Sequence, residues 1–333
     1  MNRLIDCIVK NNSRNTPVWF MRQAGRYLPE FMKIRKQNSD FVKLCLNSEL
    51  AKEITIQPVK RFDIDAAIIF SDILLVPHSL GQTVNFKKDF GPQLDEIDFN
   101  KVSSIDETYF VDKLKPVYNA IKKTKDKEEL KDKDLIGFVG APWTILVYML
   151  NQKSPKKENL NHKFKDKKLV EDLLKILVKF LKIHIENQIN SGATIIQIFD
   201  SWAGLLDKKD YENYIYEPTK DLVDFVKSKK TPAICFPKGI KDYKSYVSIV
   251  NPDVISIDYD VDPIEISKTI NITVQGGLNP NFLIGSKEEL QKNVKKYLDI
   301  FRDKPYIFNL GHGVLPDTDP SMVDYLVKLV KNY

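Results

Sequence analysis

The chain has 333 residues, of which 43% are hydrophobic and 29% are charged, and its formal net charge is +6. This length permits one large core as readily as two average domains, and since α/β barrels often reach it as one unit, we expect a single domain over 1–333. No apolar run approaches the roughly 20 residues that cross a bilayer, so the composition predicts a globular protein without a membrane-spanning segment.

Much of the lysine lies in two mixed-charge tracts, 122–134 and 152–168, and not in a stripe interleaved with aromatic residues. Such tracts are typical of solvated helices and loops, so the charge does not favour a nucleic-acid partner. A mildly positive field would still help to steer a polyanionic small molecule into a cleft.

The remaining compositional signals concern location and metals. Residues 1–10 lack the apolar region of a secretory signal, so we expect a cytoplasmic protein. Cys7, Cys45 and Cys235 have no paired spacing and no nearby histidine. We therefore expect buried thiols in a reducing compartment and neither a disulfide framework nor a zinc site.

Short apolar runs alternate with longer amphipathic segments from Ala66 onward. Continuous apolarity at this length is typical of parallel strands that are covered on both faces, and segments such as 169–190 and 287–302 have helical length and spacing. With 18–21 as a candidate eighth strand, the pattern favours a (β/α)₈ TIM-type barrel over an open doubly wound sheet. An N-terminal extension and an extra hairpin, 83–86 turning toward Gln93, would complete it. The predicted strands are 66–70, 135–139, 194–199, 232–236, 254–257, 272–275 and 306–309.

Short segments that contain candidate site residues follow several of these strands directly. They are Ser-Asp at 71–72, Ala-Pro-Trp at 141–143, Asp-Ser-Trp at 200–202 and Gly-His-Gly at 311–313. A barrel places its active site at the carboxyl ends of its strands, so we expect these residues to surround one site.

Two arginines, Arg22 and Arg26, lie in a short segment that contains Gly25 and Pro29. Glycine permits backbone angles closed to other residues, and proline disfavours helix at Leu28, so both arginines are predicted in a shaped loop. The guanidinium group matches a carboxylate or phosphate bidentately, which predicts an anion-binding loop. The alternative is a pair of solvated surface arginines.

Asp72 ends an apolar strand, where a carboxylate must be solvated by an ion, a ligand or donors within the barrel. The alternative is that it caps the next helix. Tyr148 could be a core aromatic residue, and Ser201 could be a helix N-cap. His312 lies between two glycines that leave it little packing of its own and would let a ligand approach the backbone closely, although a lone histidine is often structural.

Five separated motifs between positions 17 and 316 resemble those of the uroporphyrinogen decarboxylase family, in the same order. They are Met-Arg-Gln-Ala-Gly-Arg-Tyr-Leu-Pro-Glu-Phe at 21–31, Ile-Phe-Ser-Asp-Ile-Leu at 69–74, Gly-Ala-Pro-Trp-Thr at 140–144, Gln-Ile-Phe-Asp-Ser-Trp-Ala-Gly at 197–204 and Asn-Leu-Gly-His-Gly at 309–313. The resemblance implies conversion of uroporphyrinogen III to coproporphyrinogen III, with release of CO₂ from each acetate side chain, by a homodimer that uses no metal or organic cofactor.

The resemblance also implies roles for individual residues. Asp72 and Arg22 would be catalytic, and Asp72 would accept hydrogen bonds from the pyrrole N–H groups. The serine that matches Ser201 contacts a substrate carboxylate in the family. The implied substrate-binding set is Arg22, Gln23, Ala24, Gly25, Arg26, Asp72, Tyr148, Ser201 and His312.

Some positions depart from the family pattern, and other functions stay open. The loop at His78 lacks an expected acidic neighbour, and Gly277 and Asn279 replace the usual residues of their motif. Corrinoid-dependent methyltransferases share the architecture but need a His-x-Cys zinc site, and Ala233 stands where that histidine would precede Cys235. A non-catalytic tetrapyrrole carrier is the third alternative. The start of 258–262 mimics a calcium-binding loop, but a strand-end loop is the better interpretation.

Overall fold

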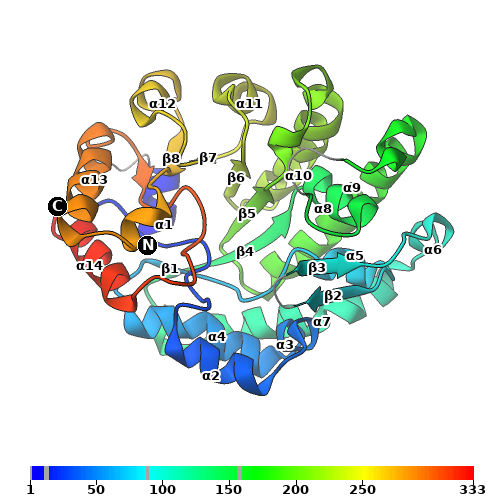
Figure 1. Ribbon diagram of the computed structural model, residues 1–333, viewed down its shortest axis with the longest axis horizontal. Coiled ribbons are helices and arrows are strands. Elements are labelled where there is room, and N and C mark those ends of the chain that lie inside the picture. The colour runs from blue at the N-terminus through cyan, green and yellow to red at the C-terminus, as the bar shows by residue number, and fades with distance from the viewer. Residues whose placement is uncertain (1, 11–14, 88–89, 156–159) are drawn as a thin grey trace.

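Seven parallel strands form one sheet that curls around a central axis in this computed structural model, which describes residues 2–10, 15–87, 90–155 and 160–333 (Figure 1). Their order in the sheet is β1-β4-β5-β6-β7-β8-β9, and all pairings are parallel. Every strand predicted from residue 66 onward is confirmed. The strands are Ala66–Ile68 (β1), Asp134–Gly140 (β4), Ile195–Asp200 (β5), Ala233–Pro237 (β6), Val254–Ile257 (β7), Thr273–Gly276 (β8) and Tyr306–Ile307 (β9).

The barrel closes at Val18, which lies between the first and last strands of the sheet. Val18 forms a parallel bridge with Phe308, and its carbonyl accepts a hydrogen bond from the amide of Asp65 at 2.8 Å. The Asp65 carboxylate accepts the Val18 amide in return at 2.7 Å. The predicted eighth strand, 18–21, is thus only a single bridge, because the chain turns away from the sheet at Met21.

The helices surround the sheet in Figure 1, and the predicted hairpin of β2 and β3 projects beside α5. Although α9 has 25 residues, no helix in the described ranges is long and apolar enough to cross a membrane. Residues 156–159 of the second mixed-charge tract lie outside the described residues. The elements are Pro29–Gln37 (α2), Phe41–Cys45 (α3), Ser48–Arg61 (α4), Leu75–Ser79 (α5), Val84–Lys87 (β2), Gly91–Leu94 (β3), Phe99–Ser103 (α6), Glu107–Lys125 (α7), Pro142–Asn151 (α8), Lys167–Ser191 (α9), Glu217–Ser228 (α10), Tyr243–Val250 (α11), Pro263–Thr269 (α12), Lys287–Ile300 (α13) and Pro320–Lys331 (α14).

The long helix α9 shows why these segments are helical. Asp166 caps its first turn by accepting the Leu169 amide, and Gly192 ends it in the left-handed conformation with φ 116°. Its buried side chains recur at helical spacing, from Val170 to Leu173, Leu174 and beyond, and form one apolar stripe. The helix predicted at 169–190 is therefore confirmed, with slightly wider bounds.

An N-terminal helix, Arg3–Val9 (α1), covers the amino ends of the strands. The amide of Ile5 donates to the carboxylate of Asp134 at the start of β4, and the Cys7 thiol donates to the carbonyl of Tyr306 at the start of β9. A separate apolar cluster fills this end of the barrel beneath α1. Its members are Leu4, Cys7, Ile8, Trp19, Met21, Ala66, Ile136, Ile195, Ile234, Phe236, Val254 and Ile307.

A polar layer links several strands inside the barrel. Gln275 on β8 accepts from the Trp19 indole at 3.0 Å and donates to both Gln197 and Ser256 at 3.2 Å. All these side chains are fully buried. Buried polar groups that pair in this way favour one arrangement of the strands, and within the layer Nε2 of Gln197 makes no hydrogen bond with a described residue.

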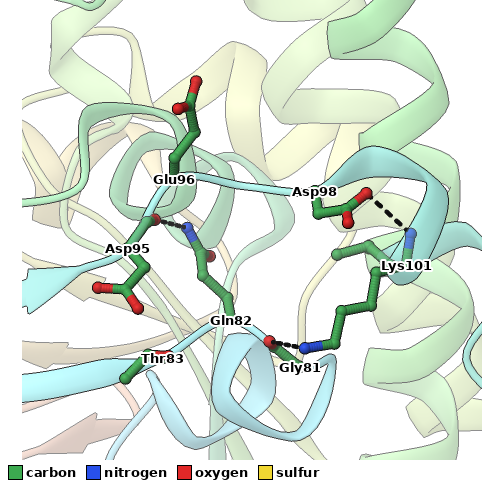
Figure 2. A pocket seen from close by; sticks show the side chains of 8 residues that line it. Gly81, Gln82, Thr83, Asp95, Glu96, Asp98 and Lys101 are labelled. Carbon is green, nitrogen blue, oxygen red and sulfur yellow. Dashed lines mark hydrogen bonds between the residues drawn. The ribbon is translucent and has the colours of Figure 1, made fainter.

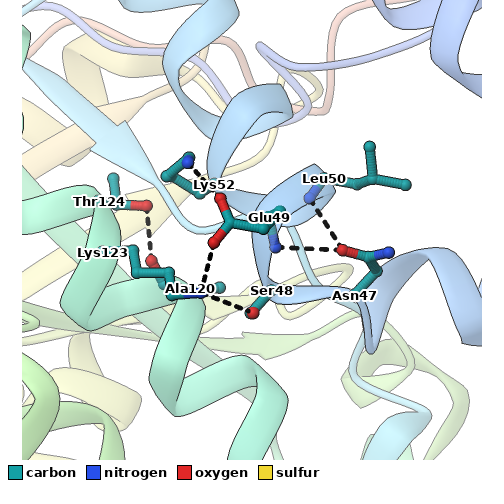
Figure 3. A network of polar contacts seen from close by, with 8 residues as sticks. All are labelled: Asn47, Ser48, Glu49, Leu50, Lys52, Ala120, Lys123 and Thr124. Atoms are coloured by element: carbon teal, nitrogen blue, oxygen red, sulfur yellow. Dashed lines mark hydrogen bonds and ion pairs between the residues drawn. The ribbon is translucent and has the colours of Figure 1, made fainter.

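Outside the barrel, one acidic side chain connects two neighbouring helices (Figure 3). Glu49 on α4 pairs with Lys52 on the same helix and with Lys123 on α7. These lysines lower the pKa of Glu49 to about 2. The pairs are exposed, so they orient α4 against α7 more than they stabilise the fold.

We expect Asp65→Ala to destabilise the protein by about 3 kcal/mol, because the buried Val18 amide and the nearly buried Lys331 ammonium group both lose their partner. Denaturant unfolding followed by circular dichroism measures this. Glu128→Ala, which removes an exposed ion pair with Lys131, is the control and should leave the unfolding free energy nearly unchanged. Equal unfolding curves for the two variants would contradict a role for Asp65 in barrel closure.

Candidate functional site

The loop that contains Arg22 and Arg26, residues 21–28 and called the arginine loop below, is held between β1 and the segment that follows β9. The amide of Met21 donates to the side chain of Asn309 at 3.1 Å, and the Met21 carbonyl accepts the amide of Val314 at 2.9 Å. The buried Gln23 side chain donates to the carbonyl of Ala66 at 3.0 Å. Tertiary structure thus brings the motifs at 21–31 and 309–313 together.

The loop conformation is confirmed, but the left-handed residue within it is Arg22 and not Gly25. Arg22 has φ 59°, while Gly25 is not among the residues with positive φ. A non-glycine residue in this region costs free energy that the surrounding contacts must offset. Gly25 is needed for space instead, because a Cβ there would lie 2.9 Å from the Arg22 carbonyl oxygen. The backbone amides of Ala24 and Gly25 donate to no described residue.

The glycines around His312 accommodate other parts of the protein, and the expectation that they admit a ligand to the backbone stays a prediction. A Cβ at Gly313 would lie 2.4 Å from Cδ of Arg22, and one at Gly311 would lie 2.3 Å from the backbone nitrogen of Tyr259. Gly313 therefore lets the stem of Arg22 pass against the chain, and this contact determines where the guanidinium group can lie.

Arg22 and Arg26 are both exposed, and neither makes a hydrogen bond or an ion pair with a described residue. The other described arginines are engaged; Arg61, for example, pairs with Glu30 through two hydrogen bonds. Guanidinium groups without protein partners are available to bind an anion.

Asp72 lies in the loop between β1 and α5 and is partly accessible. One carboxylate oxygen accepts the amide of Leu74 at 2.8 Å, so the side chain forms a local turn. It does not cap α5, because the N-cap of that helix is Leu74. Burial raises the pKa of Asp72 to about 6, although the Leu74 amide and the nearby charge of Arg22 both act to lower it.

Tyr148 and Ser201 lie on adjacent parts of the rim of the barrel, by which we mean the segments that follow the carboxyl ends of the strands. The Tyr148 ring packs edge-on against Trp202 at 5.9 Å between ring centroids. Burial raises the pKa of Tyr148, which also experiences the charges of Asp72 and Arg22. Ser201 is half-buried and is not a helix N-cap, because the short helix after it is preceded by Trp202.

His312 is half-buried beside the arginine loop. Burial lowers its pKa to about 4, and the positive charges of Arg22 and Lys238 contribute to the shift. The imidazole is therefore neutral near pH 7, which suits it to donate or accept a hydrogen bond without adding charge.

One buried pair beneath the rim is not evident from the sequence. Thr144 donates to the carboxyl group of Asp200 at 2.5 Å, and the Thr144 hydroxyl oxygen accepts the amide of Trp202 at 3.0 Å. Burial raises the pKa of Asp200 to about 7. These bonds shape the loop that carries Ser201, and no spacing rule links residues this far apart in the chain.

A small cavity lies elsewhere, beside the hairpin (Figure 2). It measures about 190 Å³, and two of its side-chain donors are engaged: Gln82 donates to the carbonyl of Asp95 at 2.7 Å and Lys101 to that of Gly81 at 2.9 Å. We interpret this cavity as structural because its donors are already engaged.

The described residues contain no cluster of histidine, cysteine or acidic side chains that could hold a metal ion. All three cysteines are buried, as expected. Cys235 on β6 has its pKa raised to about 12 by burial, and Ala233, two residues before it, offers no ligand atom. The segment 258–262 is the loop between β7 and α12, as predicted.

Comparison with known proteins identifies the family. The sequence matches the profile described as Uroporphyrinogen decarboxylase (URO-D) over residues 1–333. The chain belongs to the uroporphyrinogen decarboxylase family. It is 42% identical to the uroporphyrinogen decarboxylase of Rickettsia bellii (strain RML369-C), covering 99% of this chain and 98% of that one. It is 43% identical to that of Orientia tsutsugamushi (strain Ikeda), covering 100% and 99%.

Among solved structures, a methyltransferase from Methanosarcina mazei superposes with a TM-score of 0.81 at 16% identity, covering 99% of this chain and 97% of that one. At this identity the likeness shows that the fold is shared. Family membership therefore rests on the sequence, and the fold agrees with it.

We expect Thr144→Val to lower the free energy of unfolding by about 2–3 kcal/mol, because it leaves the buried Asp200 carboxyl group and the Trp202 amide without a partner. Urea denaturation measures the change. Thr144→Ser retains the hydroxyl group and is the matched control. If the valine variant is as stable as the serine variant, the hydrogen bonds do not hold this loop.

Proposed function

We propose that this chain decarboxylates the four acetate side chains of uroporphyrinogen III to give coproporphyrinogen III in tetrapyrrole biosynthesis. The observation that carries the proposal is a carboxylate, Asp72, within electrostatic reach of Arg22, an arginine with no protein partner, at the carboxyl ends of the strands. Tyr148 and His312 experience the same arginine. Family membership over the whole chain supports the substrate and the reaction.

The chemistry requires a sink for the electrons that remain when CO₂ leaves. The substrate's own pyrrole can provide it: protonation of a ring carbon gives a cation conjugated to the acetate side chain. Loss of CO₂ then yields a neutral enamine-like system. Protonation of its exocyclic carbon gives the methyl group, and loss of the proton first added to the ring carbon restores the neutral pyrrole. The protein must therefore stabilise a positive ring more strongly than a neutral one.

Asp72 is the group that can do this. Its second carboxylate oxygen makes no hydrogen bond with a described residue, while the first accepts the amide of Leu74. In our proposal, the carboxylate accepts hydrogen bonds from the pyrrole N–H groups and opposes the ring cation as a fixed charge. Such a charge is most effective when it is already in place and water is excluded.

The arginines and the neutral rim side chains would bind the carboxylates of the substrate. Arg22 and Arg26 would form charged pairs, and the free amides of Ala24 and Gly25 would add neutral donors. Tyr148, Ser201 and His312 would complete carboxylate binding. Arg22 lies near the reacting ring in this scheme but is a poor general acid, because arginine stays protonated in proteins.

We also propose that the enzyme works as a homodimer in the cytoplasm without a metal or organic cofactor, as the family resemblance implies. The direct test of the function is anaerobic incubation of metal-stripped protein with uroporphyrinogen III, followed by oxidation and chromatography. We expect products with seven, six, five and four carboxyl groups to appear in turn. Unchanged substrate with a folded protein would overturn the proposal and favour a carrier or a methyltransferase.

We expect kcat/KM to fall about tenfold per pH unit as the pH decreases below about 6, because Asp72 then becomes protonated and loses its charge. Steady-state rates between pH 5 and 8 measure this. His312, with a pKa lowered to about 4, should add no transition in this range. Asp72→Asn should be slow at every pH and show no such transition, whereas the exposed Asp132→Asn should behave as wild type. A wild-type rate for Asp72→Asn would disprove the counter-charge role.

We expect Gly313→Ala to lower kcat/KM about 100-fold while the thermal unfolding midpoint changes little, because the new methyl group displaces the flexible Arg22 side chain. Gly285→Ala is the control, since its nearest neighbour is the end of the Glu289 side chain at 3.2 Å. Initial rates and melting curves separate the two effects. Full activity of Gly313→Ala would show that the position of Arg22 does not depend on this contact.

A further inference from the structure

Lys238 is the first residue after β6, at the carboxyl end of the barrel, and no motif singled it out. Its amide donates to the carbonyl of Asp200 at the end of β5, and its carbonyl accepts the amide of Gly204, both at 3.0 Å. The backbone of Lys238 is therefore bound on both sides to the loop that carries Ser201. Its Cα position is determined by the sheet and not by a free loop.

A close backbone contact reinforces this position. A Cβ at Gly204 would lie 2.9 Å from both the Cα and the carbonyl oxygen of Gly239, the residue after Lys238. Only glycine at 204 lets the two loops meet at this distance. The loops after β5 and β6 thus form one rigid part of the rim.

The same rim continues to His312. In the pairing of β6 with β7, Cys235 lies opposite Ile255. If the same register is continued three residues beyond these positions, Lys238 lies beside Asp258. Gly311 in turn lies directly against the backbone of Asp258 and Tyr259. The charge of Lys238 reaches both Asp258 and His312, where it acts together with that of Arg22.

The Lys238 side chain is only half-exposed, yet it forms no ion pair or hydrogen bond with a described residue. Three lysines on neighbouring elements are paired: Lys208 with Asp242, Lys227 with Asp253 and Lys229 with Glu186. Lys241 and Lys244 are unpaired as well, but unlike Lys238 they are exposed to solvent. Asp258 is the nearest candidate, but its carboxylate accepts the amide of Tyr259 at 2.8 Å and is not within ion-pair distance of Lys238.

We propose that Lys238 binds a carboxylate of the substrate, as a third cation opposite the arginine loop. This inference rests on the proposed function, because an unpaired ammonium group on a rim that already holds Arg22 is stabilised by a polyanionic ligand. Uroporphyrinogen carries more carboxylates than two arginines can pair. Lys238 approaches from the β6 side of the barrel, whereas Arg22 and Arg26 approach from the loop between Val18 and α2, so the cations would hold different side chains of one macrocycle.

The test compares Lys238→Gln, Lys238→Met, Lys238→Arg and Lys241→Gln with wild type. Lys241 is exposed, lies three residues further along the same loop and loses the same charge. Initial rates with uroporphyrinogen III under anaerobic conditions give kcat and KM separately, at two salt concentrations, and melting curves test the fold.

We expect Lys238→Gln and Lys238→Met to raise KM about tenfold with little change in kcat, because a charge-assisted hydrogen bond to the substrate is lost. Lys238→Arg should restore much of the binding, Lys241→Gln should match wild type, and the salt dependence of kcat/KM should weaken only in the uncharged Lys238 variants. All melting midpoints should agree within a few degrees.

A KM for Lys238→Gln equal to that for Lys241→Gln would overturn the inference, as would a fall in kcat at unchanged KM. A lowered melting midpoint that Lys238→Arg does not restore would assign Lys238 a structural role instead and would overturn it too. Wild-type protein that leaves the substrate unchanged would contradict the proposed function itself, so the two failures are distinguishable.

Discussion

Closure of the barrel at Val18 is the constraint on which the candidate site depends. Asp65 binds Val18 through both its amide and its carboxylate, and Phe308 forms a parallel bridge with Val18 from the other side through hydrogen bonds to Pro17 and Trp19. The arginine loop begins only three residues later, so closure determines where Arg22 emerges. The amide of Met21 is hydrogen-bonded to the side chain of Asn309 in the segment after β9, so the same closure places Arg22 against Gly313.

The charges at the rim divide into groups that the protein pairs and groups that it leaves available. Glu30 pairs with Arg61, and Lys208, Lys227 and Lys229 pair with nearby acids, but Arg22, Arg26 and the half-buried Lys238 have no such partner among the described residues. Asp72 faces this positive rim with a raised pKa. A single carboxylate among unpaired cations is suited to a ligand that carries many negative charges and a ring of N–H donors.

The site is supported by buried polar groups whose function is positional. Gln23 ties the arginine loop to β1, and the Asp200–Thr144 pair holds the loop of Ser201. Such groups cost free energy to bury and contribute stability only when each has its partner. The left-handed Arg22 is a further cost, and its surroundings maintain it.

Local sequence determined the strands, the long helices and the loop character of 21–28, because apolar runs, caps and Pro29 act over a few residues. It also determined the family, since the motifs occur in order along the chain. Tertiary structure alone decided that Val18 contributes one bridge, that Arg22 and not Gly25 is left-handed, and that the glycines beside His312 admit Arg22 and Tyr259. Lys238 was likewise invisible in the sequence, because an unpaired lysine is defined by the partners it lacks in space. These features depend on contacts between residues distant in the chain, and no local pattern encodes them.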